Sequence, residues 1–477
     1  MAMRIFTLSV LLFVGLSAFG QSRRVPPATP VIAAQPAMQT ADTALSVKQM
    51  YEEVNGYVRA KATEFEAKKM PFSEGLLNRT KLEQRQLAAR YAAMAASRTL
   101  AGDDLYYLGM LHWIAENLDG TVDNLRKFII LTDVDAARRQ TARSVAMVVL
   151  SKQKKLDEAE SMLAEYLKNE PTKLTERARM EGELAKAYQA KKDFARMAPH
   201  AVEDYNAAKK LLKDSASLAR GLDEILDAGM LVFEAWRDSG KRTKADEALD
   251  DMSATAAQTA SPSFYFYAVD QKIRYLIDTR RKPQAMEFYA ATLANVGRVF
   301  PMKELQADVA MRLRKKEKHY RLLGEPAPEF ASVDQWFPGT QKTLADLKGK
   351  VVLLDFWATW CGPCIEAFPA LIEWQQDFSR DGFEILGVTR YYGMASGMAA
   401  DEKSELEYLK RYRRDKGLSY PFVVAKGQGL QLQYGATGLP TTVLVDRKGI
   451  VRYIEAGTST SRLLQTREMI LKLLAEK

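Results

Sequence analysis

The stretch Val351–Pro369 reads VVLLDFWATWCGPCIEAFP and holds both cysteines of this 477-residue chain, Cys361 and Cys364. The segment Val351–Trp357 is apolar except for Asp355, a pattern typical of a buried central strand. The residues that follow, Gly362–Phe378, have the pattern of a helix. The two cysteine side chains should therefore lie one turn apart on one face of that helix, at its N-terminus.

Two cysteines at this spacing could form a structural disulfide, part of a metal site or a redox couple. A disulfide across so short a loop removes little chain entropy, so it would stabilise the fold weakly. A structural zinc ion needs four ligands, and the chain has no second cysteine pair and only three scattered histidines. A c-type haem site needs histidine after the second cysteine, where this chain has Ile365. We therefore predict redox chemistry, with no metal and no cofactor besides the Cys361–Cys364 couple.

The position at the start of a helix gives Cys361 the properties of a nucleophile. Free backbone N–H groups and the helix dipole stabilise a thiolate there. Such sites lower a thiol pKa from about 8.5 to between roughly 3.5 and 7.5. The Cys361 thiolate would attack a substrate disulfide, and Cys364 would then resolve the mixed disulfide. Pro363 keeps the loop stiff and is tolerated in the first helical turn.

The rest of residues 323–477 alternates between strand and helix patterns. Strands are expected in Phe383–Arg390 and in the segments YPFVVA, TTVLVD and IVRYIEA, with a hairpin turn at Arg447–Gly449. Helices are expected over Glu402–Lys416 and Leu463–Glu476. This alternation predicts a C-terminal α/β domain.

Residues 44–322 have a helical pattern throughout, rich in Ala, Leu, Glu, Lys and Arg. A small residue, an aromatic residue and a terminal proline recur, as in Ala159, Tyr166 and Pro171, which resembles the tetratricopeptide (TPR) pattern. The steps from Thr121 to Ala159 and from Ala159 to Ala195 are 38 and 36 residues, against about 34 in that family. We predict an α-helical, TPR-like solenoid; an irregular helical bundle is the alternative.

The N-terminus predicts export. Residues 1–20 read as a signal peptide, with an apolar run of about 15 residues that is shorter than the roughly 20 a membrane-spanning helix needs. An uncleaved anchor is the alternative. Residues 21–43 form a Pro/Ala-rich linker. We therefore expect the protein in the bacterial periplasm.

Charge gives no indication of nucleic-acid binding. The chain has a net charge of +9, while residues 324–477 hold 19 basic and 19 acidic side chains, so the excess lies in the helical part. Basic and acidic residues are interleaved there, as on solvated helix faces.

The motif DFWATWCGPC resembles the active-site signature of thioredoxins, and GLPTT places Pro440, 76 residues past Cys364, at that family's cis-proline position. GEPAPEF, at Gly324–Phe330, and the segment KTLADLKGKVVLLDFWATWC resemble the exported TlpA/ResA-like branch and the broader redoxin group. The resemblance covers residues 323–477 and implies a thioredoxin-like fold.

The resemblance also implies roles for single residues. Cys361 matches the nucleophile, Cys364 the resolving cysteine, and Asp355 a buried carboxylate that accepts the proton of Cys364. The residues implied to pack against the cysteines or to contact substrate are Pro440, Trp360, Gly362, Pro363 and Leu439. Many TlpA-like proteins carry an acid where this chain has Ala367, and the neighbouring Glu366 lies about 100° around the helix, so that role does not transfer to it.

These observations predict an exported thiol–disulfide oxidoreductase that reduces protein disulfides, with the helical region as a platform for a protein partner. Its partners would be protein disulfides or dithiols and a membrane-bound or exported electron donor. One alternative is a helical adaptor whose thioredoxin-like domain only docks. A second is a redoxin-type peroxidase, although Ala358 stands where the peroxidatic motif Pro-x-x-x-Thr-x-x-Cys has threonine.

Overall fold

The computed structural model describes residues 45–476 except residues 72, 213–220 and 331. The predicted signal peptide, residues 1–20, and the predicted linker, residues 21–43, lie outside these residues. The chain divides into two compact units, with the boundary between Gly240 and Lys241. None of the helices in the described residues is both long enough and apolar enough to cross a membrane.

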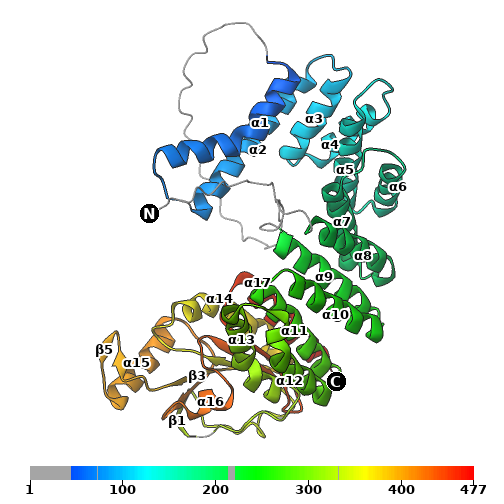
Figure 1. Ribbon diagram of the computed structural model, residues 1–477. Helices are drawn as coiled ribbons and strands as arrows, with labels where there is room; N and C mark the ends of the chain where they lie inside the picture. The colour runs from blue at the N-terminus through cyan, green and yellow to red at the C-terminus, as the bar shows by residue number, and fades with distance from the viewer. Residues whose placement is uncertain (1–44, 72, 213–220, 331, 477) are drawn as a thin grey trace, which may run out of the picture. The chain divides into compact units, whose positions relative to one another are not determined.

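The described part of the first unit is helical, and helices adjacent in sequence pack in pairs (Figure 1). Close packing has a visible cause at Gly109, where an added Cβ would lie 2.6 Å from Leu125 of the next helix. The helical prediction is confirmed; the TPR-like repeat stays a prediction. The helices are α1 (Val47–Ala67), α2 (Glu74–Ala96), α3 (Asp103–Ile114), α4 (Leu118–Ile129), α5 (Ala136–Lys152), α6 (Leu156–Leu167), α7 (Leu174–Lys191), α8 (Phe194–Leu211) and α9 (Gly221–Asp238).

The second unit opens with four more helices, and α11 packs against α10, α12 and α13. The change from helices to an α/β pattern comes at the end of α13, close to the predicted boundary between residues 322 and 323. The compact unit, however, already begins at Lys241, so it joins these helices to the α/β part. They are α10 (Arg242–Gln258), α11 (Pro262–Asp278), α12 (Lys282–Val299) and α13 (Lys303–Leu322).

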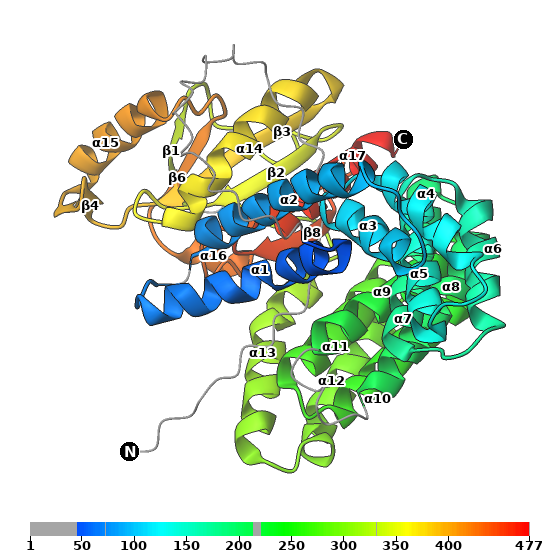
Figure 2. The ribbon, with the colours of Figure 1, turned by 90° about the horizontal axis from the view of Figure 1, so that it is seen from above.

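The α/β part is built on a mixed six-stranded sheet in the order β1-β6-β3-β2-β7-β8 (Figure 2). Strands β6, β3 and β2 are parallel, and β1, β7 and β8 run antiparallel to their neighbours. The strands are β1 (Val333–Phe337), β2 (Val351–Phe356), β3 (Phe383–Arg390), β6 (Phe422–Ala425), β7 (Thr441–Val445) and β8 (Val451–Ala456), and a separate hairpin holds β4 (Met394–Ala395) and β5 (Met398–Ala399). The helices are α14 (Gly362–Phe378), α15 (Glu402–Asp415), α16 (Gly429–Gln433) and α17 (Thr460–Ala475), with a 3-10 turn at Ser379–Asp381.

Most of the predicted elements of the α/β part are confirmed. The bounds of α14 and β3 are those expected, and β2 ends one residue earlier, at Phe356. Helix α17 begins at Thr460 rather than at Leu463, because the hydroxyl of Ser459 accepts the backbone N–H of Arg462 and caps the helix.

Side-chain alternation along β2 positions the site. Val351, Leu353 and Trp357 belong to the hydrophobic cluster that also contains α14, α15 and α17 side chains. Asp355 has the same parity, so it points toward the helices on this face of the sheet.

Candidate active site

Cys361 is the N-cap of α14, and its sulfur lies where the first turn of the helix presents backbone donors. The Cys364 N–H donates to Cys361 Sγ at 3.3 Å. In this structure the two cysteines form a disulfide with a Cα–Cα distance of 5.3 Å. When the pair is reduced, the same N–H group and the helix dipole stabilise a thiolate on Cys361. The helix starts at Gly362 as predicted, and Cys361 immediately before it has the predicted electrostatic environment.

Both cysteines are buried: Cys361 is 4% exposed and Cys364 is 1% exposed. The turn between them is open, because Gly362 and Pro363 are both exposed. A substrate can therefore approach the disulfide over this turn, at the surface where the sequence places substrate contacts.

Asp355 is the buried carboxylate that the sequence predicts, and it is only 2% exposed. Its Oδ2 has no hydrogen-bond partner among the described residues. Because burial disfavours the charged form, it raises the pKa of Asp355 to about 7. A carboxylate with a pKa near neutrality can accept a proton from a thiol and return it to solvent.

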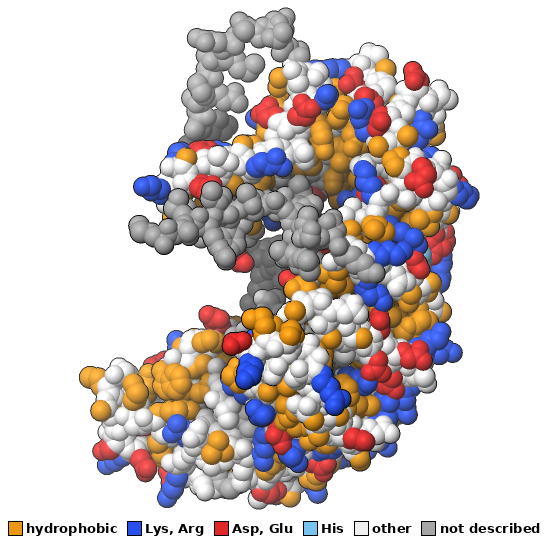
Figure 3. Space-filling view, viewed as in Figure 1, with side chains coloured by type: hydrophobic (Ala, Val, Ile, Leu, Met, Phe, Trp, Pro, Cys, Tyr) orange, Lys and Arg blue, Asp and Glu red, His pale blue; other side chains and the backbone are white. Residues whose placement is uncertain are grey.

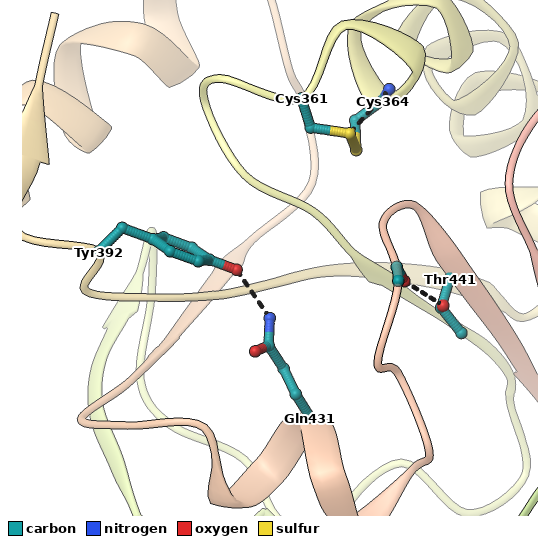
Figure 4. Close-up of a disulfide and its surroundings, with 6 residues drawn as sticks. Cys361, Cys364, Tyr392, Gln431 and Thr441 are labelled. Carbon is teal, nitrogen blue, oxygen red and sulfur yellow. Dashed lines mark hydrogen bonds between the residues drawn. A yellow bond between two sulfur atoms is a disulfide. The ribbon is translucent and has the colours of Figure 1, made fainter. Parts of the chain in front are cut away.

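The Leu439–Pro440 peptide bond is cis, and Pro440 and Asp355 line the same cavity. Leu439 is half-buried and packs against the cluster that contains both cysteines. The turn is held at both ends, because Thr441 Oγ1 donates to Gly438 O at 2.6 Å and Gly457 N donates to Pro440 O at 2.7 Å. Figure 4 draws Thr441 with this hydrogen bond in the same view as the disulfide. The structure thus brings Asp355, Pro440 and Leu439 to the region of the cysteines.

Trp360, which precedes Cys361 in the chain, has an exposed side chain. It is 56% exposed, and its ring meets the ring of Tyr392 edge-on at 5.4 Å. The guanidinium of Arg390 lies 4.1 Å from the Tyr392 ring centroid, and Gln431 Nε2 donates to Tyr392 Oη at 2.9 Å (Figure 4). These contacts fix Tyr392, and Tyr392 in turn supports Trp360.

Sequence reasoning did not find Tyr392, Gln431 and Arg390, although a signal existed. Strands β2, β3 and β6 are parallel, so their carboxyl ends meet at one edge of the sheet, where open α/β sheets bind ligands. Cys361 follows β2, Tyr392 follows β3 and Gln431 follows β6. Reading the residues after each parallel strand would have grouped them.

Two further predictions concern residues outside this edge. Glu366 is exposed, whereas Ala367 lines the Asp355 cavity, so the family's acid position is apolar here and Glu366 does not replace it. Within the described residues, no three His, Cys, Asp or Glu side chains are grouped so that they could hold a metal ion.

Comparison with known proteins adds the following. The family profile described as redoxin matches residues 322–470. The thioredoxin-like protein YneN of Bacillus subtilis (strain 168) is 32% identical over 142 residues, which are 30% of this chain and 76% of YneN. The thiol-disulfide oxidoreductase ResA of Geobacillus thermodenitrificans (strain NG80-2) is 34% identical over 145 residues, 30% of this chain and 75% of ResA.

Solved structures were also found. A thiol:disulfide interchange protein, a thioredoxin family protein from Chlorobium tepidum TLS, is 25% identical and covers 32% of this chain and 97% of its own, with a TM-score of 0.26.

Proposed function

The chain belongs, through its C-terminal domain, to the thioredoxin-fold thiol–disulfide oxidoreductases of the redoxin group, and we propose that it is an exported enzyme that reduces disulfides in proteins. The observation that carries the proposal is the position of Cys361. Its sulfur accepts the Cys364 N–H at the start of α14, which stabilises the attacking thiolate.

The proposed reaction runs in two exchanges. The Cys361 thiolate attacks one sulfur of the substrate disulfide, and the other substrate sulfur leaves as a thiolate. Asp355 then takes the proton of Cys364, and the Cys364 thiolate attacks the Cys361 sulfur of the mixed disulfide. The second substrate thiolate leaves, the substrate has gained two electrons, and the Cys361–Cys364 disulfide remains. An external dithiol donor must reduce this disulfide before the next cycle.

Protein substrates suit the surface around the site. Figure 3 shows hydrophobic side chains gathered over the part of the domain that holds α14, α15 and β5. The large exposed hydrophobic residues of these and the adjoining segments are Trp360, Met394 and Met398, of which Met398 is 70% exposed. Exposed apolar side chains near a reactive group favour a protein or peptide as the substrate.

The direction of electron flow can be measured. The Gly362–Pro363 turn resembles that of reducing thioredoxins, so we expect the reduction potential of the Cys361–Cys364 couple to lie nearer the roughly −270 mV of thioredoxin than the roughly −120 mV of the oxidant DsbA. Equilibration with defined dithiol–disulfide buffers, followed by alkylation of the free thiols, measures it. A potential near the DsbA value would show that this protein is an oxidant and would overturn the reductase proposal.

Export rests on the N-terminal sequence. If the signal peptide is removed, sequencing of the mature chain should start at Gln21, and a mature chain that starts at residue 1 or 2 would contradict cleavage. The platform role of α1–α9 stays a prediction.

A further inference from the structure

A row of polar side chains crosses the sheet from the active site to its edge. Asp355 of β2 pairs with Thr442 of β7, and Thr442 pairs with Glu455 of β8. Residues directly opposite one another on adjacent strands point to the same face. All three line one small cavity of about 20 Å³, which α14 and α17 close. Glu455 is therefore the second carboxylate of the cavity that holds Asp355.

Three cationic side chains surround Glu455: Arg462 belongs to the cavity lining, and the other two come from outside it. Arg274 Nη2 of α11 lies 3.3 Å from Glu455 Oε2. Lys316 Nζ of α13 and Arg462 Nε of α17 lie 3.9 and 3.5 Å from Oε1. Two of the three cations thus come from the helices that precede the thioredoxin-like fold.

Arg274 is also fixed at the open edge of the sheet. It donates to the backbone carbonyl of Ile454 at 3.3 Å and pairs with Asp270 of its own helix at 2.9 Å. Asp270 in turn accepts a hydrogen bond from the Tyr320 hydroxyl at 2.7 Å. The bond to Ile454 satisfies one backbone carbonyl of the edge strand β8. Satisfying that carbonyl does not require a cation aimed at Glu455.

The other titratable groups here are uncharged at neutral pH. Burial raises the pKa of Tyr420, which faces Asp355 from the segment before β6, and of Tyr320 and Tyr453, which face the Glu455 cluster. Burial lowers the pKa of His319, on α13, to about 4. Cys361 and Cys364 are bonded to each other. The charges that act on the cavity are therefore Asp270, Glu455, Arg274, Lys316 and Arg462.

Glu455 is close enough to Asp355 for its charge to change the pKa of Asp355. Asp355 and Glu455 lie on strands two positions apart, or about 10 Å between backbones. At that distance and an effective dielectric constant of about 20, an uncompensated charge on Glu455 would raise the pKa of Asp355 by about one unit.

We propose that Arg274 and Lys316 compensate Glu455, so that α11 and α13 set the pH range in which the cysteine pair turns over. Arg274 and Lys316 contact neither sulfur. They affect the proton affinity of Asp355 only through the charge of Glu455, so they are positioning residues. The helices before the thioredoxin-like fold are then part of the redox unit and not a detachable spacer. This inference rests on the proposed function, because it concerns the proton acceptor of that reaction.

The test compares the variant Arg274→Met with Arg274→Met/Glu455→Gln in the full chain. The rate of reduction of a small disulfide is followed against pH, and the Asp355 carboxyl is titrated by infrared difference spectroscopy in the oxidised protein. Arg274→Met should move the midpoint of the pH–rate profile and the midpoint of the Asp355 titration to higher pH, each by up to about one unit. The double variant should move them back toward the wild-type value, and Glu455→Gln alone should not raise them.

A matched control is Arg281→Met, because Arg281 pairs with Asp246 within the helical segment and makes no contact with Glu455 among the interactions of the described residues. Its midpoints should equal those of the wild type. If Arg274→Met does not fold, Arg462→Met tests the same carboxylate from a side chain that is about half exposed, and the shift should have the same sign.

Unshifted midpoints in Arg274→Met, or an equal shift in the double variant, would overturn the inference. The infrared titration needs no turnover, so it decides this point even if the protein reduces no disulfide. Absence of turnover in the wild type would instead contradict the proposed function.

Discussion

Replacing Cys361 by serine is expected to abolish disulfide reduction. The reaction begins with the Cys361 thiolate, and a serine hydroxyl at the same N-cap is not ionised near neutral pH and cannot form a mixed disulfide. In an insulin-reduction assay with dithiothreitol as the donor, the rate should fall to that of dithiothreitol alone. Thermal unfolding of the variant should resemble that of the wild type with its disulfide reduced, which separates lost chemistry from lost fold.

The same variant distinguishes an enzyme from an adaptor. If the thioredoxin-like domain only docks, Cys361→Ser should preserve the cellular role of the protein, whereas loss of that role supports the redox function. Residual insulin reduction above the background in the purified variant would contradict the assignment of Cys361 as the nucleophile.

Replacing Asp355 by asparagine is expected to stabilise the oxidised protein strongly at alkaline pH. The pKa of Asp355 is about 7 in the fold, against 3.8 for an aspartate in water. For a raised carboxyl pKa, the folded state binds the proton more tightly than the unfolded state, so stability is lost as pH rises from about 4 to about 7. The difference between the folded and unfolded pKa values lowers the free energy of unfolding of the wild type by about 4 kcal/mol above pH 7. Asparagine cannot ionise, so the variant does not lose this stability.

Urea unfolding followed by tryptophan fluorescence measures the effect, since four of the six tryptophans lie in residues 323–477. The variant and the wild type should have similar midpoints at about pH 3, where Asp355 is protonated in both states, and the variant should be the more stable at pH 8. Resolution of the mixed disulfide should also become slower, toward the lower end of the roughly 10²–10⁴-fold that general base catalysis contributes. Equal stabilities at pH 8 would show that Asp355 is not buried in its charged form.

The thioredoxin-like fold could be predicted because its signals are local. The apolar run of β2, the cysteine motif and the helix that follows lie within 28 consecutive residues, Val351–Phe378. Asp355 stood out for a physical reason as well, because an ionisable group in a buried strand is costly and asks for a role. Pro440 lies far along the chain, and only the resemblance to a known family connected it to the cysteines.

The parts that the sequence did not predict depend on long-range pairing. Glu455 joins Asp355 only through the register of β2, β7 and β8, and Arg274 reaches Glu455 across 181 positions of sequence. The side chain of Arg274 gave no signal of its own, since an arginine on a helix is usually solvated. The boundary at Gly240 was missed for the same reason, because α10–α13 have the same helical pattern as the helices before them.

A single-turnover reaction of the reduced Cys364→Ala variant with a synthetic peptide that contains one internal disulfide tests whether Cys361 is the nucleophile. Cys361 should attack the peptide disulfide and release one peptide thiolate. Quenching with an alkylating reagent blocks that thiolate, so without Cys364 the mixed disulfide should persist. Mass spectrometry should then find one peptide joined to Cys361 and released by dithiothreitol. The reduced Cys361→Ala variant should form no such adduct. An adduct on Cys364 in that variant at the same rate, or none on Cys361 in a folded Cys364→Ala protein, would contradict the assignment of Cys361 as the nucleophile.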